Sequence, residues 1–469
     1  GCGVDSDGFG LSECKPMNTL ARIGRRGAAL LLAWGGIAGL RAAEPSSPPA
    51  SAEAPWPEIR KKTFAEVWQT VNDAYFDPTF GGVDWAAVRE TYRPRLEQAA
   101  DNPALRALLQ AMLGELHRTH FAILPRETAV FTPEERQRIG TIGADFVTVE
   151  NQVVVARVRP DSAAATAGLA PGDAVRAVNG RPLAEVDAWL ETSGMSAARR
   201  AFYLAGYVSS WAQAAVGTRV TLRVESGENP PRDVELMCAA HDGAWSEPIG
   251  NYPAQPLELD ATRSADGIVT LRFNVFAPPL MKGLKARLRA LRPGDGLVLD
   301  LRSNPGGISV MAPGLSGWLV ARELSLGSMT LRQGYMSFAV YPQSGAFAGP
   351  VAILIDHGSA STSEILAAGL QEAGRARVFG ETSAGAALPS SFRVLPTGDL
   401  FQYAVGDMKT PGGKLLEGHG VEPDEVVHNT RADLAAGRDR VQDAARAWIR
   451  RERESAGPDG SASPGPADL

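Results

Sequence analysis

Residues 353–370 read ILIDHGSASTSEILAAGL, an apolar run that leads into three alternating serines and then into a second apolar stretch. The first run is typical of a buried strand and the second of a buried helix. Ser361 and Glu364 have the spacing of a capping box at a helix start. The same position presents free backbone N–H groups and the positive end of a helix dipole to any oxyanion formed there. Local sequence leaves both a helix cap and a catalytic serine open.

A second strand end lies at residues 300–307, which read DLRSNPGG. Gly306 and Gly307 let backbone N–H groups approach a ligand closely, because neither carries a side chain. A Pro-Gly-Gly sequence by itself indicates only a turn. Next to a helix that begins with serines, it predicts the second half of an oxyanion hole.

Strands and helices alternate from about residue 257 to 435. GIVTLRF, GLVLDLRSNPGG and PVAILIDHG read as buried strands, and LMKGLKARLRALRPG reads as a helix with leucines on one face. This alternation predicts an α/β layer structure with its active groups at strand ends.

Residues 56–135 have a helical pattern. In NPALRALLQAMLGEL, residues 102–116, leucine and methionine recur at helical spacing after a capping Asp101 or Asn102. This pattern predicts one buried helix face. His117 and His120 fall at or just past the end of the helix, where a side chain can face a cleft.

Residues 140–238 change to short strands broken by Pro, Gly and Asn. GADF and SAAATAGLAPGDAVRAVNG resemble the signature of a PDZ domain. The resemblance implies that a loop captures the C-terminus of a peptide, which adds to the sheet as a strand. The carboxylate-binding loop would be Ile142, Gly143, Ala144, Asp145 and Phe146. A PDZ-shaped spacer with a blocked groove is the alternative.

With these motifs the chain resembles the tail-specific, or C-terminal-processing, protease family. The resemblance rests on DLRSNPGG, GSASTSEILAAGLQEAGRARVFGE and LLEGHGVEPDEVV, in the family's order. It implies a helical N-terminal part, a PDZ domain and a core related to the Clp protease and crotonase folds. It also implies that Ser361 is the nucleophile, supported by Ser359 and Ser363. The oxyanion hole would be formed by the N–H groups of Thr362 and of Gly306 or Gly307.

One departure from the family concerns the general base. Many members activate the serine with a lysine in a Gly-Glu-x-x-x-Gly-Lys-Gly segment, but GETSAGAA places Ala386 there. The tricorn-like branch uses a histidine and a glutamate instead. By that resemblance His120, preceded by Thr119, is the base, and Glu417 supports it. A histidine accepts protons well at neutral pH, and a carboxylate fixes its tautomer.

Five other residues are weaker candidates. His117 lies nearer the apolar helix face, and His357 is expected to shape the turn before Ser361. His419 and Lys414 flank Glu417, and Lys414 is the alternative amine for a serine–lysine dyad. Glu372 is expected to make surface contacts. The histidines and cysteines show no zinc-binding spacing and no phosphate loop appears, so we expect neither a metal nor an organic cofactor.

Residues 17–50 have the layout of a secretory signal peptide, with arginines, an apolar run from Gly27 to Leu40 and a Pro/Ser-rich spacer. The run is shorter than a membrane-spanning helix. We therefore expect export to a bacterial periplasm or cell envelope, with no integral span in the mature chain. Residues 1–16 do not suit a signal start. Cys238 would be the only exported cysteine, which excludes an internal disulfide there.

The charge balance of 47 basic and 53 acidic residues gives a net charge of -6, and no basic stretch suits nucleic acid. The expected organisation is five segments, which are residues 1–55 (upstream residues, signal and spacer), 56–138 (helical), 139–240 (PDZ), 241–440 (serine protease core) and 441–469 (helix end and disordered tail). The expected function is cleavage of exported polypeptides through an acyl-enzyme on Ser361. Alternatives are an inactive peptide-binding scaffold and a hydrolase of non-peptide esters. The oligomeric state is left open.

Overall fold

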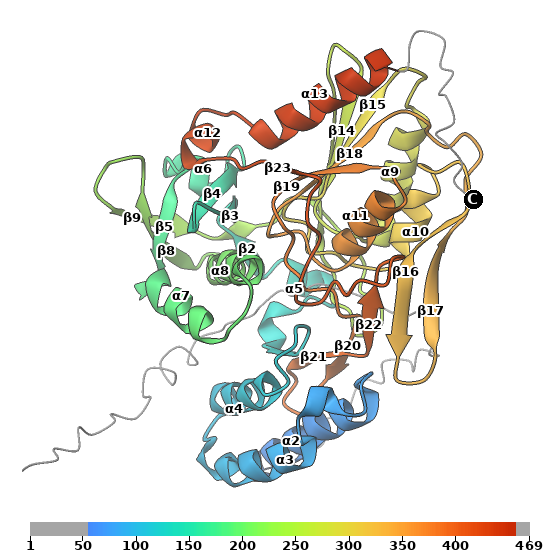
Figure 1. Ribbon diagram of the computed structural model, residues 1–469. Helices are drawn as coiled ribbons and strands as arrows, with labels where there is room; N and C mark the ends of the chain where they lie inside the picture. Colours follow the sequence, from blue (N-terminus) through green and yellow to red (C-terminus); the bar gives the residue numbers. More distant parts are fainter. Residues whose placement is uncertain (1–54, 456–469) are drawn as a thin grey trace, which may run out of the picture.

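The computed structural model describes residues 55–455, so the expected signal region and the C-terminal tail lie outside the described residues. The described chain forms a helical region, a sheet region packed on its own helices, and an α/β core (Figure 1). Among residues 55–455, no helix has the length and apolar character that a membrane crossing requires.

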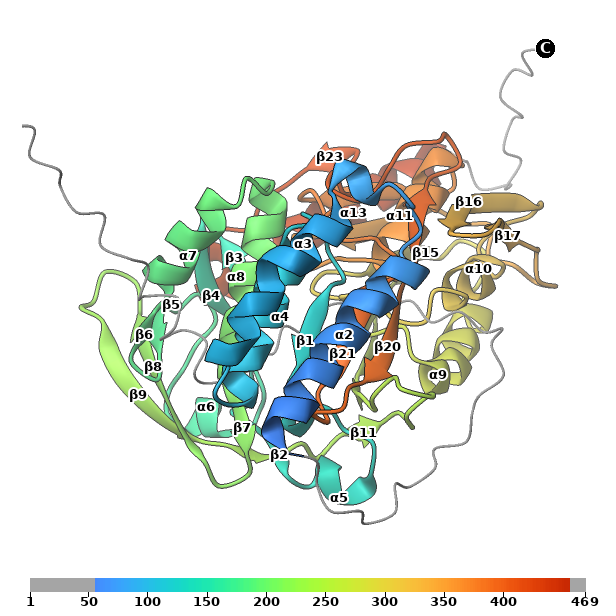
Figure 2. The same cartoon turned by 90° about the horizontal axis from the view of Figure 1, so that it is seen from below.

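The helical region consists of α2 (Trp56–Ala74), α3 (Trp85–Tyr92) and α4 (Asn102–Gly114), with short 3₁₀ helices between them. Asp101 caps α4 as expected, because its carboxylate accepts the Ala104 N–H. The buried face of these helices packs on a hairpin from far along the chain, β20 (Ser390–Val394) and β21 (Leu400–Ala404). Strand β1 (Ala122–Leu124) pairs with β21, as Figure 2 shows.

The second region is built on the sheet β3-β4-β5-β8-β9, in which β3 is an edge strand. Alternating valines and leucines of these strands form its core with two long helices. The strands are β3 (Ala144–Val149), β4 (Gln152–Val158), β5 (Ala174–Val178), β8 (Arg219–Glu225) and β9 (Arg232–Met237), with β6 (Arg181–Pro182) on β5. The helices are α6 (Ala163–Thr166), α7 (Leu183–Thr192) and α8 (Ala197–Trp211).

Short strands connect the regions. These are β2 (Ile139–Thr141), β7 (Gln213–Ala215), β10 (Ala239–Ala240), β11 (Ala244–Trp245) and β12 (Pro256–Leu257), with α5 (Pro133–Arg136) before β2.

The core sheet has the order β13-β14-β15-β18-β19-β23, parallel except for the edge strand β13. The strands are β13 (Leu259–Arg263), β14 (Ile268–Phe273), β15 (Gly296–Asp300), β18 (Val351–Ile355), β19 (Arg377–Gly380) and β23 (Glu425–Val426). The main hydrophobic core contains residues of three helices, α9 (Pro278–Arg289), α10 (Met311–Ser316) and α11 (Thr362–Glu372). A separate hydrophobic cluster is formed where α13 (Arg440–Ser455) packs on the sheet. Both faces are covered, which explains the continuous apolar runs of β15 and β18.

A smaller sheet of β16 (Leu324–Leu331), β17 (Tyr335–Val340) and β22 (Gly406–Lys409) flanks the core, and α12 (Arg431–Ala435) precedes α13. The carboxyl ends of β15, β18 and β19 lie side by side in the parallel sheet. The turns that follow them therefore meet at one edge, where ligands bind in open α/β sheets.

Candidate active site

Ser361 lies between β18 and α11 with φ 53° and ψ −115°, a conformation that non-glycine residues rarely adopt. Its side chain is only 3% exposed. Such backbone strain persists where the surroundings hold it, and it is common at active sites. The neighbouring hydroxyls of Ser359 and Ser363 donate to Leu301 O and Asn304 O, each at 2.8 Å. They tie the serine loop to the turn after β15.

The turn after β15 brings backbone N–H groups to Ser361. Gly307 lies opposite Phe276 in a parallel β-bridge. The hydrogen bonds of the bridge are made by Gly306 O and Ile308 N, so the N–H and C=O of Gly307 face away from Phe276. The Gly307 carbonyl accepts the Thr362 hydroxyl at 2.8 Å. A Cβ placed on Gly306 would lie 2.8 Å from both Ser361 Cβ and Thr362 N. The Gly306 N–H itself donates to the Asn304 side chain at 2.9 Å.

Thr119, His120 and Glu417 meet, although 298 residues separate Thr119 from Glu417. The Thr119 hydroxyl lies 2.7 Å from His120 Nδ1 and 2.9 Å from Glu417 Oε2. The Thr119 backbone N–H donates to Glu417 Oε1 at 3.1 Å. His120 has a positive φ of 60° and is fully buried. The hydroxyl therefore bridges the imidazole and the carboxylate.

Residues Gly385–Ala387 join the serine to this bridge. The Ser361 N–H donates to Ala386 O at 2.9 Å, and the Ala387 N–H donates to Glu417 Oε2 at 3.1 Å. Ala386, which stands where many relatives carry lysine, is fully buried. The serine loop and the Thr119–Glu417 pair are thus bound to consecutive residues of one segment.

Two residues of the site were not recognised as functional candidates from sequence. Arg199 of α8 donates to Glu417 Oε1 at 3.0 Å, and it also contacts Gly385 O. No local motif marks Arg199, since the contact joins two distant regions. Glu364 accepts the Ser361 N–H at 2.8 Å, which is the glutamate half of the predicted capping box. Burial raises the pKa of Glu364 to about 7, and that shift has no sequence signal.

The weaker candidates lie outside this cluster. His117 is exposed, and the Lys414 side chain is 80% exposed near Glu372. His357 Nδ1 lies 2.8 Å from Thr382 O, so it shapes the turn. His419 Nδ1 lies 3.1 Å from the Glu417 carbonyl rather than its carboxylate.

The predicted carboxylate-binding loop, residues 142–146, borders a separate cavity of about 290 Å³. Ile142 and the residues 144–146 contribute to its wall, and Gly143 has a positive φ of 82°. Asp145 is held by Arg157 at 2.9 Å and by Arg159 at 3.0 Å. The predicted peptide-binding loop thus borders a cavity, although it does not touch the serine cluster.

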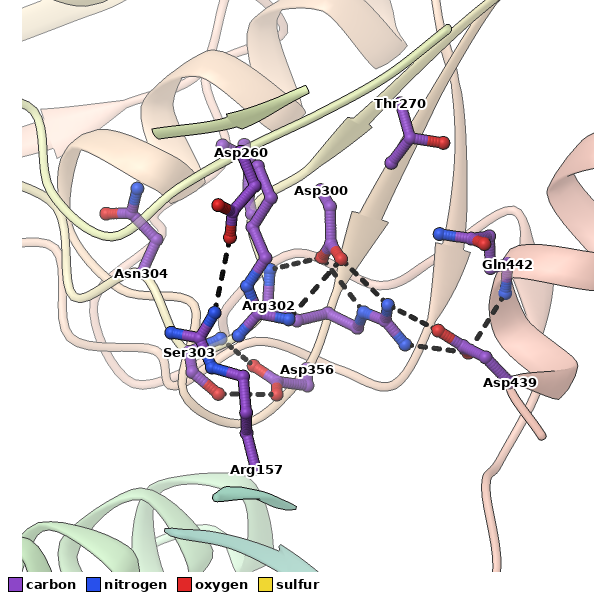
Figure 3. Close-up of polar contacts among 12 residues, drawn as sticks. Arg157, Asp260, Thr270, Asp300, Arg302, Ser303, Asn304, Asp356, Asp439 and Gln442 are labelled. Atoms are coloured by element: carbon purple, nitrogen blue, oxygen red, sulfur yellow. Dashed lines mark hydrogen bonds and ion pairs between the residues drawn. The ribbon is translucent and has the colours of Figure 1, made fainter. Parts of the chain in front are cut away.

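A charge network of Asp300, Arg302 and Asp439 lies at the end of β15 (Figure 3). Arg302 donates two hydrogen bonds to Asp300 and two to Asp439, at distances of 2.7–2.9 Å. These contacts lower the pKa of Asp300, although burial opposes that change, and they raise that of Arg302. Arg302 thus joins the end of β15 to the start of α13. Within residues 55–455, no cluster of three or more His, Cys, Asp or Glu could hold a metal ion.

Comparisons with protein families match three parts of the chain. Residues 267–427 match peptidase family S41, residues 57–114 match the tricorn protease C1 domain, and residues 140–198 match a PDZ domain. The family predicted from the sequence motifs and the multidomain fold are both confirmed.

Similar curated proteins include a carboxyl-terminal-processing protease of Synechocystis sp., 26% identical over 80% of this chain and 82% of its own. A chloroplastic C-terminal processing peptidase of Tetradesmus obliquus is 28% identical, over 77% of this chain and 76% of its own. Among solved structures, the photosystem II D1 C-terminal processing protease matches with a TM-score of 0.54 and 22% identity, over 80% of this chain and 97% of its own. Mature CPAF matches with a TM-score of 0.58 and 15% identity, over 85% of this chain and 99% of its own. At these identities, both structural matches show the fold alone.

Residues 267–427 therefore form an S41 peptidase domain, and the chain is a serine-type peptidase that is similar over most of its length to carboxyl-terminal-processing proteases.

Proposed function

We propose that this protein is an exported endopeptidase that cleaves polypeptides through an acyl-enzyme on Ser361, with His120 as the general base. The observation that carries the proposal is the Thr119 hydroxyl between His120 Nδ1 and Glu417, at 2.7 and 2.9 Å. An unassisted serine hydroxyl is a weak nucleophile, and the lysine of many relatives is replaced by Ala386. The histidine supplies the base that the alanine cannot.

The hydrogen bonds around Thr119 support one tautomer of His120. A carboxylate only accepts hydrogen bonds, so the Thr119 hydroxyl donates to Glu417 and its oxygen accepts from His120 Nδ1–H. The other ring nitrogen, Nε2, then carries the lone pair that takes the serine proton. Arg199 supplies the positive charge that balances the buried carboxylate. This arrangement needs Thr119 as a relay between the two groups.

The reaction proceeds in two stages. Ser361 Oγ bonds to the peptide carbonyl carbon while its proton passes to His120 Nε2. The C–N bond then breaks as that proton moves to the leaving amine, which gives an ester on Ser361. Water attacks the ester, its proton passes to Nε2 and then to Ser361 Oγ, and the carboxylic acid is released. The low exposure of Ser361 and His120 keeps bulk water away from the charges that develop.

The N–H groups of Gly307 and Thr362 are proposed to hold the oxyanion. The bridge to Phe276 does not use the Gly307 N–H, and Thr362 is the first residue of α11, where N–H groups lie outside the helical ladder. Gly306 has a different role, because its N–H already donates a hydrogen bond to the Asn304 side chain. Its lack of a side chain lets the turn pass against Ser361.

The PDZ domain is proposed to select substrates by their C-terminus. Strand β3 is an edge strand, so an extended peptide can pair with it. The loop Ile142, Gly143, Ala144, Asp145 and Phe146 would supply N–H groups to the terminal carboxylate. Peptides with a free C-terminus should be cleaved with a lower KM than amidated peptides of the same sequence. Equal KM values would show that the loop does not read the terminus.

Export is proposed from the pattern of residues 17–50 alone. A fusion of residues 17–55 to a reporter that is active only outside the cytoplasm should be active. Deletion of residues 27–40 from the fusion is the control, and an inactive intact fusion would contradict export.

The catalytic assignment is tested with a fluorophosphonate probe, which bonds to an activated serine, and with a peptide substrate. Wild type should be labelled and should cleave, whereas Ser361→Ala and His120→Ala should do neither. His117→Ala is the matched control, because His117 is exposed and lies three residues from His120. Undiminished labelling of a folded His120→Ala variant would overturn the assignment of the base.

A further inference from the structure

Glu364 lies directly behind the nucleophile and is fully buried. Its Oε2 accepts the N–H groups of Ser361 and Ala386, at 2.8 and 3.1 Å. Its Oε1 accepts the Ser383 hydroxyl at 2.6 Å and the Gly385 N–H at 2.8 Å. Each carboxylate oxygen has two lone-pair positions, so the four donors fill the acceptor capacity of the group.

The four partners of Glu364 all act as donors. Three are backbone N–H groups, which cannot accept a hydrogen bond. The fourth, the Ser383 hydroxyl, already accepts the Val421 N–H at 2.6 Å, and its hydrogen points to Glu364. Protonation of Glu364 places a hydrogen where a donor already lies, so either one N–H bond is lost or the Ser383 hydroxyl must turn its hydrogen away and accept instead. The surroundings of this side chain therefore match an ionised carboxylate.

The same carboxylate holds the strained serine and the segment beside it. Ser361 adopts φ 53° and ψ −115°, and its N–H is shared between Glu364 and Ala386 O. Residues 383–386 are held by Glu364, and the next residue, Ala387, donates to Glu417. Glu364 thus links the nucleophile to the group that orients the base.

We infer that Glu364 is a positioning residue that acts in its ionised form: it holds Ser361 in the nucleophile conformation and keeps residues 383–387 in register with Glu417. This inference rests on the proposed function, in which Ser361 attacks the substrate. An enzyme molecule with protonated Glu364 keeps its fold but loses the alignment that catalysis needs.

The ionisation falls in the physiological range. Burial raises the pKa of Glu364 to about 7, while the Ser383 and backbone hydrogen bonds oppose the rise and the charge of Glu417 adds to it. Glu417 is itself paired with Arg199, and His120 is the other proton-transfer group of the proposed site. Tyr203 and Asp407 also interact electrostatically with Glu417. As the proposed general base, His120 must also be unprotonated, so activity requires that both groups have lost a proton.

The test is the pH dependence of fluorophosphonate labelling, measured on the full chain. In wild type, two deprotonations should make the rate fall roughly 100-fold for each pH unit well below both transitions. Glu364→Gln, which carries a donor in place of one acceptor, should be labelled at least about tenfold more slowly at about pH 8, and its rate should fall only about tenfold per unit. Ser383→Ala removes a hydrogen-bond donor to the Glu364 carboxylate, which disfavours the ionised form. The fall of the labelling rate on the acidic side of its pH profile should therefore move to higher pH.

Ser390→Ala is the matched control, because Ser390 is a buried hydroxyl that accepts from Gln402, whereas Ser383 donates to Glu364. Its profile should coincide with wild type, and circular dichroism should show that all variants are folded. The inference is overturned if Glu364→Gln is labelled as fast as wild type with the same slope, or if Ser383→Ala does not shift. A wild type that no probe labels at any pH would instead refute the proposed function, and this inference with it.

Discussion

Arg199 of the PDZ region donates to Glu417 of the peptidase core at 3.0 Å, and both side chains are almost fully buried. The contact joins two parts of the chain that are 218 residues apart. Since Glu417 accepts from Thr119, a residue outside the core completes the surroundings of the proposed base.

Arg199→Met should reduce kcat/KM on a peptide substrate by roughly 10- to 100-fold. The substitution leaves the Glu417 carboxylate buried without a cation, which weakens its hydrogen bond to Thr119 and disturbs the imidazole. Arg200→Met is the control, since Arg200 pairs with Asp187 and Glu191 inside the PDZ region. Equal loss in both variants would mean that the PDZ fold, and not the contact to Glu417, is responsible.

Thr119→Val should reduce kcat by roughly 100-fold or more, whereas Thr119→Ser should retain most activity. Valine keeps the shape of threonine but removes the hydroxyl that bridges His120 Nδ1 and Glu417. Serine restores that hydroxyl. The measurement is kcat against pH for both variants, and an active Thr119→Val enzyme would show that the relay is unnecessary.

Gly306→Ala should reduce fluorophosphonate labelling on the order of 100-fold. An added Cβ would lie 2.8 Å from Ser361 Cβ and from Thr362 N, so the turn would move away from Ser361. Gly294→Ala is a matched control, because Gly294 also has a positive φ, 85°, but has open space around its Cβ position. A comparable loss of labelling in Gly294→Ala would mean that backbone strain in general, and not the contact with Ser361, causes the effect.

Asp439→Asn should destabilise the protein by about 1–2 kcal/mol at neutral pH, after allowance for partial exposure of the side chain. Arg302 holds the pKa of Asp439 at about 2, below its ordinary value of 3.8. The lowered pKa means that the stabilisation is complete above about pH 4 and disappears as pH falls through about 2. Urea unfolding at several pH values checks this.

Asp443→Asn is the control for that experiment, since Asp443 is exposed in the first turn of α13, the helix that Asp439 precedes. The difference between wild type and Asp439→Asn should shrink between about pH 4 and pH 2, while the control stays constant. A difference that is independent of pH would show that lost packing, and not the ion pair with Arg302, explains the effect.

The elements of this fold follow from local patterns. The apolar runs at 296–301 and 351–355 became buried parallel strands, and Asp101 with the leucines after it became the capped helix α4. Short-range forces decide such elements, because strand and helix periods and caps involve neighbouring residues. The motifs around Ser361 and Gly307 likewise predicted strand ends, and parallel strands bring their ends together.

The sequence by itself determined the strands, the main helices, the family and the serine loop, since each is written in contiguous residues. Only the tertiary structure decided how Thr119 bridges His120 and Glu417, that Arg199 pairs with that carboxylate, and that Glu364 meets four donors. Hydrogen bonds and desolvation depend on distance in space, and residues 298 positions apart leave no joint local pattern. The chemistry of the site therefore arises from packing among regions that are separate along the chain.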